Sequence, residues 1–249
     1  MKDTKDNFTN QSNKYAKYRP AYPSHLYSFL YSLVKDNGAA WDCGTGNGQV
    51  AIVLSDFFDQ VYATDISEQQ IKNAVPRENV FYSVERAEST SFADNSFGLV
   101  TVAQAIHWFD FESFYKEVNR TLKPNGILAV IGYGLIRIDH ETDPVIDSFY
   151  HDVIGPYWDK ERKYVDENYQ TIPFPFNEIR APVLDNIFEW TREEFTGYLE
   201  TWSAVQHYIK AENKNPVPLI SAELEKIWPK GETKKVQFPI LLRVAKIKK

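Results

Sequence analysis

Cysteine is nearly absent from this sequence, with Cys43 as the one thiol among 249 residues. One cysteine cannot form an internal disulfide framework or a cysteine-rich zinc site. The histidines and carboxylates show no clustered spacing of the kind that binds a metal, so we expect no metal. Scarce cysteine agrees with a reducing compartment, and we expect a cytoplasmic protein.

Long apolar runs are also lacking. The longest nearly apolar stretch, residues 126–136, is too short to span a bilayer. Residues 1–14 are polar where a signal peptide would be apolar. We therefore expect a protein that has no membrane partner and is not exported.

Positive charge is not in excess. The chain has 28 lysines and arginines against 34 aspartates and glutamates, which gives a formal net charge of −6. Nucleic-acid binding relies on a basic surface, so this balance argues against a nucleic-acid partner. Aromatic side chains are abundant, at 15% of residues, which indicates a ring-rich core or ring-lined pockets.

Residues 38–132 alternate short apolar runs with stretches of helical spacing. This order is typical of βα units in a parallel sheet whose strands are covered on both faces. The expected strands are residues 39–43, 60–64, 80–84, 99–103 and 127–131. The expected helices are residues 49–57, residues 68–75 after a cap at Ser67, and residues 111–122 before a turn at 123–126.

The composition changes after residue 132, where tyrosine, tryptophan, phenylalanine and proline become frequent. This pattern predicts an aromatic-rich cap packed on the sheet. Within it, Thr191 and Glu194 have capping-box spacing and predict a helix through about residue 205. Residues 232–247 predict a last strand, antiparallel at the sheet edge. The chain thus divides into an N-terminal lid or helical segment, a core, a cap and a C-terminal strand, at residues 1–37, 38–132, 133–230 and 231–249.

A glycine-rich loop follows the first expected strand and carries Asp42, Gly44, Gly46 and Gly48. Glycines at such a point let the backbone approach a ligand closely. The second strand ends in Asp65, where a carboxylate can accept hydrogen bonds from both hydroxyls of a ribose. The combination predicts an adenosine-containing ligand.

Two features argue against a dinucleotide in this loop. The dinucleotide pattern G-x-G-x-x-G needs a third glycine at the position of Gln49. The carboxylate of Asp42 would also repel a bound pyrophosphate, whereas it would attract a cationic group.

These residues resemble the first motif of class I S-adenosylmethionine-dependent methyltransferases, acidic-x-G-x-G-x-G, and the chain is similar to the type 11 group. The resemblance implies S-adenosylmethionine as the cofactor. It also implies a Rossmann-like α/β fold, with a mostly parallel seven-stranded sheet, an antiparallel final strand and helices on both faces. In this family the cofactor contacts residues after the second, third and fourth strands, here Ile66, Ala87, Glu88, Gln104 and Ala105.

A narrower likeness connects the chain to the subgroup related to trans-aconitate methyltransferase. It rests on residues near the N-terminus, including Tyr15, Tyr18 and Arg19, and on residues 104–110 and 201–203. The likeness implies a small-molecule acceptor, in some cases a carboxylate, and an N-terminal lid. It also implies that Arg19 pairs with the methionine carboxylate of the cofactor.

The acceptor is expected beside the loop that follows the fourth strand. His107, Tyr18 and Trp108 are the candidate catalytic or acceptor-contacting residues. A carboxylate acceptor needs no general base at neutral pH, whereas a hydroxyl or amine acceptor would need His107 or Tyr18 to take its proton. The transfer itself demands mainly alignment of acceptor, methyl and sulfur, with water excluded.

Other function classes are weighed on the same residues. Base-amino methyltransferases carry an Asp/Asn-Pro-Pro-aromatic run after the fourth strand, where this chain has Ala-Gln-Ala-Ile at residues 103–106. Cytosine C5 methylation needs a thiolate nucleophile, but Cys43 lies inside the glycine loop. An NAD-type oxidoreductase and a non-catalytic cofactor-binding module stay open as alternatives. Binding of NADH against S-adenosylhomocysteine, and acceptor-dependent methyl transfer, would distinguish them.

Overall fold

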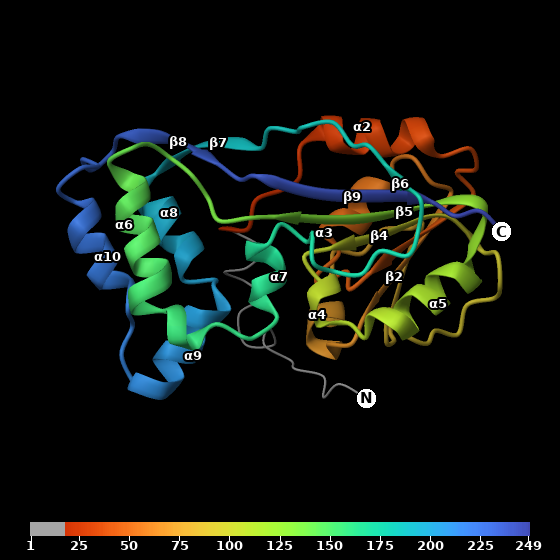
Figure 1. Cartoon of the computed structure of the whole chain (residues 1–249), viewed down its shortest axis with the longest axis horizontal. Coiled ribbons are helices and arrows are strands. Elements are labelled where there is room, and N and C mark those ends of the chain that lie inside the picture. Colours follow the sequence, from red (N-terminus) through yellow and green to blue (C-terminus); the bar gives the residue numbers. More distant parts are fainter. Residues whose placement is uncertain (1–17) are drawn as a thin grey trace.

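Seven strands form one sheet in the order β3-β2-β1-β4-β5-β9-β6 (Figure 1). The computed structural model describes residues 18–249. Strands β1 to β5 are parallel, β9 is antiparallel to β5, and β6 is antiparallel to β9. The mostly parallel Rossmann-like sheet is therefore confirmed. The strands are β1 Ala39–Cys43, β2 Gln60–Asp65, β3 Val80–Val84, β4 Phe97–Ala103, β5 Leu122–Tyr133, β6 Glu178–Ile179 and β9 Ile240–Lys246.

Apolar side chains alternate between the two faces of the central strands. Along β5, Ile127, Ala129 and Ile131 belong to one hydrophobic cluster, and Leu128 and Val130 belong to another. A strand that is apolar on both sides needs a helix layer on each face, which explains the helices above and below the sheet. These helices are α2 (Ser24–Leu33) and α3 (Gln49–Leu54) on one face and α5 (Phe111–Thr121) on the other.

Two helices are shorter than predicted. α3 ends at Leu54, where the sequence predicted residue 57, and α4 (Glu68–Lys72) ends before residue 75. Val75 precedes a proline, which disfavours helical backbone at that position. Ser67 caps α4 as predicted, because its hydroxyl accepts a hydrogen bond from the backbone N–H of Gln70.

The start of β5 was also predicted wrongly. The strand begins at Leu122 and includes the residues that were expected to form a turn. Leu122 pairs with Phe97 and Ile127 pairs with Leu99, so residues 123–126 bulge out of the ladder between them. Asn125 in this bulge has φ +68, a left-handed conformation that asparagine adopts more readily than most residues.

The predicted last strand is two strands in two sheets. β8 (Thr233–Gln237) pairs with β7 (Ile187–Thr191) in a separate two-stranded sheet, and β9 alone joins the main sheet. Pro239 lies between them and has no N–H to donate to a ladder, so the run is interrupted there. β9 is not at the edge either, because β6 pairs with its outer side.

The cap has a hydrophobic core of its own. Figure 1 shows α6, α8, α9 and α10 gathered at one end of the molecule, with α7 between them and the sheet. Thr191 and Glu194 form the predicted capping box, but the predicted helix breaks at residues 200–202 into α8 and α9. At the break, the Thr201 hydroxyl donates to the Tyr198 carbonyl, a local bond that competes with helix continuation. The cap elements are α6 (Thr142–Ser148), η2 (Phe149–Val153), η3 (Gly155–Tyr157), α7 (Arg162–Asp166), α8 (Arg192–Leu199), α9 (Ser203–Glu212) and α10 (Val217–Leu224).

Two parts of the cap region lie against the sheet: β6 pairs with β9, and the segment around α7 packs on one face. Val165, Tyr169 and Ile172 are buried in the same cluster as α5 and the sheet. The remaining cap helices pack on each other around Phe195 and Trp228, in a second cluster. Across residues 18–249, the structure has no helix that combines the length and the apolar character needed to cross a membrane.

Candidate active site

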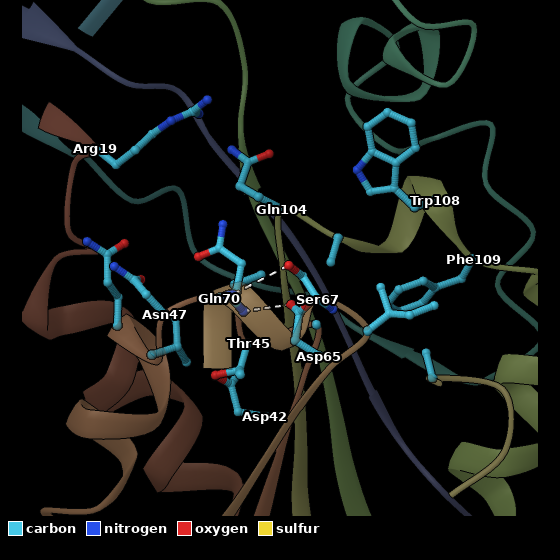
Figure 2. A pocket seen from close by; sticks show the side chains of 18 of the residues that line it. Arg19, Asp42, Thr45, Asn47, Asp65, Ser67, Gln70, Gln104, Trp108 and Phe109 are labelled. Carbon is cyan, nitrogen blue, oxygen red and sulfur yellow. Dashed lines mark hydrogen bonds between the residues drawn. The ribbon is translucent and has the colours of Figure 1, made fainter. Parts of the chain in front are cut away.

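A crevice of about 200 Å³ lies where the five parallel strands end. Because parallel strands have their carboxyl ends at one edge of the sheet, the residues after β1, β2, β3 and β4 converge there. Figure 2 shows Asp42 and Thr45 at the bottom of the crevice, Arg19 and Gln104 at the top, and Trp108 and Phe109 along one side. The predicted cofactor-binding residues that line it are Arg19, Asp42, Gly44, Gly46, Asp65, Ile66, Ala87, Glu88, Gln104 and Ala105.

Asp42 is a buried acid at the end of β1, with only 1% of its surface exposed. Its Oδ1 accepts a hydrogen bond from the Thr101 hydroxyl at 2.7 Å, and its Oδ2 accepts one from the Thr45 hydroxyl at 2.5 Å. Burial raises the pKa of Asp42 to about 6, and the charge of Asp65 adds to the rise. The ionised carboxylate is thus incompletely compensated, and a cationic ligand group would stabilise it.

Asp65 ties the glycine loop to the end of β2. Its Oδ2 accepts a hydrogen bond from the backbone N–H of Gly46 at 2.8 Å, and its Oδ1 accepts one from that of Ser67 at 2.9 Å. Gly46 has φ +58, and a Cβ at this position would meet no atom within 4 Å. The free space beside Gly46 belongs to the crevice, so the bare backbone leaves room for a ligand.

Gly48 departs from the prediction, because it does not line the crevice. It has φ +87, and a Cβ there would lie 2.2 Å from the hydroxyl oxygen of Tyr82. The residue directly precedes α3. Its lack of a side chain therefore serves the packing of Tyr82 and the entry into the helix.

Ala87 and Glu88 form the rim of the crevice after β3. Oε1 of Glu88 accepts a hydrogen bond from the backbone N–H of Asp110 at 3.0 Å. A guanidinium nitrogen of Arg86 lies 3.5 Å from its Oε2. Glu88 thereby connects the loop after β3 to the loop after β4, which closes this side of the crevice.

Gln70 lines the crevice although no motif pointed to it. The side chain is 4% exposed, and its Oε1 has no hydrogen-bond partner among residues 18–249. An unsatisfied buried acceptor costs about 1–3 kcal/mol, and a ligand donor would remove that penalty. Its position on the helix directly after Asp65 is the one signal in the sequence that could have indicated it.

Gln104 ends β4 in a left-handed conformation, with φ +54. Its Nε2 donates a hydrogen bond to the carbonyl oxygen of Tyr133 at 3.2 Å. Non-glycine residues adopt this conformation at a cost of roughly 1–2 kcal/mol, and such strain concentrates at functional sites. The turn at Gln104 directs the following loop, with Trp108 and Phe109, along the crevice.

Arg19 joins the N-terminal segment to the sheet and the cap. Its Nη1 donates to the Tyr133 hydroxyl at 2.9 Å, and its Nη2 donates to the carbonyl of Thr201 at 3.1 Å. The guanidinium also lies 5.6 Å from the ring centre of Tyr198. Tyr15, which was predicted to belong to the same lid, lies outside the described residues.

A smaller cavity of about 50 Å³ adjoins the crevice. Arg19, Gln104 and Trp108 line both spaces and mark the boundary between them. The cap supplies most of the remaining wall, so this cavity lies between the sheet end and the cap. The residues that line only the smaller cavity are His107, Trp158, Asp159, Arg162, Trp202 and Ser203.

The three predicted catalytic residues lie in different places. Trp108 is at the boundary, and the buried His107 lines only the smaller cavity. Nδ1 of His107 is 3.4 Å from the hydroxyl oxygen of Tyr169, which the sequence did not indicate. Tyr18 lines neither space; its ring packs on Gly197, where a Cβ would lie 2.7 Å from it. This placement favours a packing role for Tyr18.

Comparison with known proteins decides the family. A Dictyostelium discoideum protein named as a methyltransferase is 34% identical over 97% of this chain and 95% of its own length. A solved structure from Anaeromyxobacter dehalogenans, described as a type II methyltransferase, is 38% identical with a TM-score of 0.85. It covers 92% of this chain and 98% of that one. The chain is a class I S-adenosylmethionine-dependent methyltransferase.

Further matches agree with this assignment. The methyltransferase domain family matches residues 41–130, which extend from β1 into β5. The methyltransferase cfoB of Aspergillus candidus is 28% identical, over 74% of this chain and 65% of that protein. The YcgJ protein of Bacillus subtilis, at 16% identity and a TM-score of 0.53, shares the fold and covers 91% of this chain.

The crevice of the methyltransferase fits S-adenosylmethionine on three observations. Asp42 carries a buried charge that a cationic group would compensate. Gly46 leaves open space at the loop, and Gln70 presents an unsatisfied acceptor oxygen. A nucleoside with cationic groups and N–H or O–H donors satisfies all three, whereas a dinucleotide would bring a diphosphate toward Asp42. The residues thus agree with the family and not with an NAD-type oxidoreductase.

Proposed function

We propose that this methyltransferase transfers a methyl group to a carboxylate oxygen of a small molecule bound in the smaller cavity. We place this methyl transfer in the cytoplasm. Asp42, Gly46, Asp65 and Gln70 hold the cofactor in the crevice. Arg19 lies at the boundary between cofactor and acceptor, in agreement with the role that the family likeness implies for it.

The observation that carries the proposal is the make-up of the smaller cavity. Two guanidinium groups, of Arg19 and Arg162, line it together with His107 and the carboxylate of Asp159. Arginine binds planar carboxylates through paired N–H donors. Trp158 and Trp202 supply apolar wall on the cap side, which suits a small organic anion and excludes water.

His107 is suited to donate a hydrogen bond to such an acceptor. The Tyr169 side chain is completely buried, and Nδ1 of His107 is the hydrogen-bond partner of its hydroxyl. Burial raises the pKa of Tyr169, so the phenol keeps its proton. A buried O–H without an acceptor costs about 1–3 kcal/mol, so the phenol donates to Nδ1 and the imidazole carries its own proton on Nε2. In this tautomer His107 is a hydrogen-bond donor on its Nε2 side, which favours an acceptor that is already ionised.

The chain then has little proton transfer to perform. S-adenosylmethionine supplies a methyl group on a positively charged sulfur, which is already a good leaving group. Transfer would form a bond between the carboxylate oxygen and the methyl carbon and break the sulfur–methyl bond, whose electron pair would stay on the sulfur, so the chain's residues would not need to move a proton. Alignment at the Gln104 and Trp108 boundary is the main contribution of the protein.

Methyl transfer to a panel of small carboxylic acids tests the proposal. With methyl-labelled cofactor, we expect a product that mild base hydrolyses to labelled methanol, because a methyl ester is base-labile and a methyl ether or amine is not. His107→Gln, which keeps a side-chain N–H donor, is expected to retain more activity than His107→Ala. A base-stable product, or no transfer to any acid, would overturn the proposed acceptor class.

A hydroxyl or amine acceptor makes a different prediction. His107 would then have to take the proton of the acceptor, and His107→Gln would be as inactive as His107→Ala. Binding of S-adenosylhomocysteine without transfer to any class of acceptor would instead support a non-catalytic module.

A further inference from the structure

Arg162 lines the smaller cavity from the first residue of α7. Its guanidinium is stacked on the cap, 4.7 Å from the ring centre of Trp158 and 5.3 Å from that of Tyr150. Only 22% of the side chain is exposed. The stacking holds the planar group in one orientation, because an arginine on an aromatic face gains cation–π attraction there.

One edge of this guanidinium is already used. Nε donates to the Tyr150 hydroxyl at 2.6 Å and lies 3.3 Å from Oδ1 of Asp166. The Tyr150 hydroxyl in turn donates to Asp166 at 2.6 Å, so the three groups form a closed network. Arg162 is thereby fixed through its Nε.

The other edge of the guanidinium consists of Nη1 and Nη2. Neither Nη1 nor Nη2 of Arg162 has a hydrogen bond to any of residues 18–249 in the structure. Arginine presents two parallel N–H groups along such an edge, which is the geometry that binds both oxygens of one carboxylate. Arg162 therefore has the form of a prepared carboxylate clamp.

The other charged groups around the cavity leave this edge favourable for an anion. Asp159 is the one carboxylate among the described lining residues, and its Oδ2 lies 3.8 Å from Nδ1 of His207. Arg19 adds a second positive charge at the boundary with the crevice. Asp166 is occupied by the Nε side of Arg162.

We propose that Arg162 binds a second carboxylate of the acceptor, one that is not methylated. This inference rests on the proposed function and adds a substrate class, small dicarboxylates. Arg162 lines only the smaller cavity, whereas Gln104 and Trp108 lie at the boundary with the crevice. A carboxylate on Arg162 would thus lie in the smaller cavity and not in the crevice. Clamping both of its oxygens also lowers their nucleophilicity, so the reacting carboxylate is the other one.

Calorimetry on the protein loaded with S-adenosylhomocysteine tests the clamp. The probes are straight-chain diacids from malonate to adipate, each compared with its monoamide, which replaces one carboxylate by a neutral group of the same shape. For at least one chain length we expect the diacid to bind roughly tenfold or more tightly than the monoamide, the size of a charge-assisted bidentate contact. In Arg162→Gln the ratio should fall to about one.

Two variants make the result interpretable. Arg162→Lys keeps the charge but loses the two-pronged geometry, and we expect a reduced ratio. Arg137→Gln, which removes a half-exposed arginine that pairs with Asp147 at the surface, should leave the ratio unchanged. S-adenosylhomocysteine binding in the same titration reports whether each variant is folded. If Arg162→Gln does not fold, the Lys variant decides the question.

The inference is overturned if no diacid is preferred over its monoamide, or if the preference survives in the Gln and Lys variants. Labelled methyl transfer separates this failure from failure of the proposed function. Transfer to monoacids and diacids alike, independent of Arg162, would keep carboxylate methylation and remove the clamp. Diacid binding that depends on Arg162 without ester formation would keep the clamp and remove carboxylate methylation.

Discussion

Replacing Asp42 by asparagine is expected to stabilise the ligand-free methyltransferase while weakening its hold on the cofactor. Burial raises the pKa of Asp42 from 3.8 to about 6. The folded protein therefore binds a proton that the unfolded chain has already released, and its stability falls as the pH rises from about 4 to 6. At pH 7 the ionised Asp42 disfavours folding by about 3 kcal/mol, at roughly 1.4 kcal/mol per pKa unit.

Asparagine removes that charge and keeps the shape. Its amide oxygen and amide N–H can each pair with one of the hydroxyls of Thr45 and Thr101, which now donate to Asp42. We expect Asp42→Asn to raise the melting temperature of the ligand-free protein at pH 7 by roughly 5 °C, the size that a few kcal/mol produces in a chain of this length. At pH 4 the two proteins should melt at similar temperatures.

The effect of the same substitution on cofactor affinity has the opposite sign to its effect on stability. A cationic ligand group prefers the ionised acid, and with a pKa of about 6 only about a tenth of Asp42 is ionised at pH 5. Calorimetry with S-adenosylhomocysteine should give an affinity roughly tenfold higher at pH 7 than at pH 5 in the natural protein. The Asn variant should bind weakly at both. A variant that melts lower and keeps the natural affinity would refute the assignment of Asp42 to the cationic end of the ligand.

Four further predictions each concern one residue. Gly46→Ala adds a Cβ to open crevice space at φ +58, so we expect a loss of about 1–2 kcal/mol of stability, measured by denaturant unfolding, together with loss of S-adenosylhomocysteine binding. In Gly48→Ala the new Cβ clashes with the Tyr82 hydroxyl, so this variant should lose more stability than Gly46→Ala. Adding Tyr82→Phe should restore part of the lost stability. Equal unfolding midpoints for the Gly46 and Gly48 variants would contradict the difference in packing. Gln70→Ala should lower S-adenosylhomocysteine affinity severalfold without lowering stability, and an unchanged affinity would mean that its Oε1 serves no ligand. Thr191→Ala removes the capping box and should cost about 1 kcal/mol with cofactor affinity unchanged.

The cofactor half of the site was predictable because its residues are local in the sequence. Asp42 near the end of β1 is followed by Gly44 and Gly46 in the next loop, and Asp65 ends β2, so strand order alone brings them to one edge of the sheet. Gln70 was missed because the sequence of a short helix does not show which of its polar residues is buried. That depends on how the helix packs. Gly48 shares the motif, yet Tyr82 from β3 decides its environment.

The acceptor half could not be read from the sequence. Arg162 and Trp202 lie far apart along the chain and meet His107 only through the packing of the cap. The cap sequence has weak hydrophobic periodicity, and its helices are short. The hydrophobic pattern therefore could not predict which cap side chains face the smaller cavity. The division of the last strand could have been predicted from the sequence, because Pro239 lies between the two strands and has no N–H for a ladder.

The separate hydrophobic core of the cap has a consequence for divergence and redesign. Phe195 and Trp228 pack on each other within the cap cluster, so we expect substitutions at these two positions to act mainly within that cluster. The residues proposed to hold the nucleoside lie at or after the ends of β1, β2 and β4, outside this cluster. A library of substitutions confined to the cap residues of the smaller cavity would therefore test new acceptors while the cofactor crevice keeps its residues.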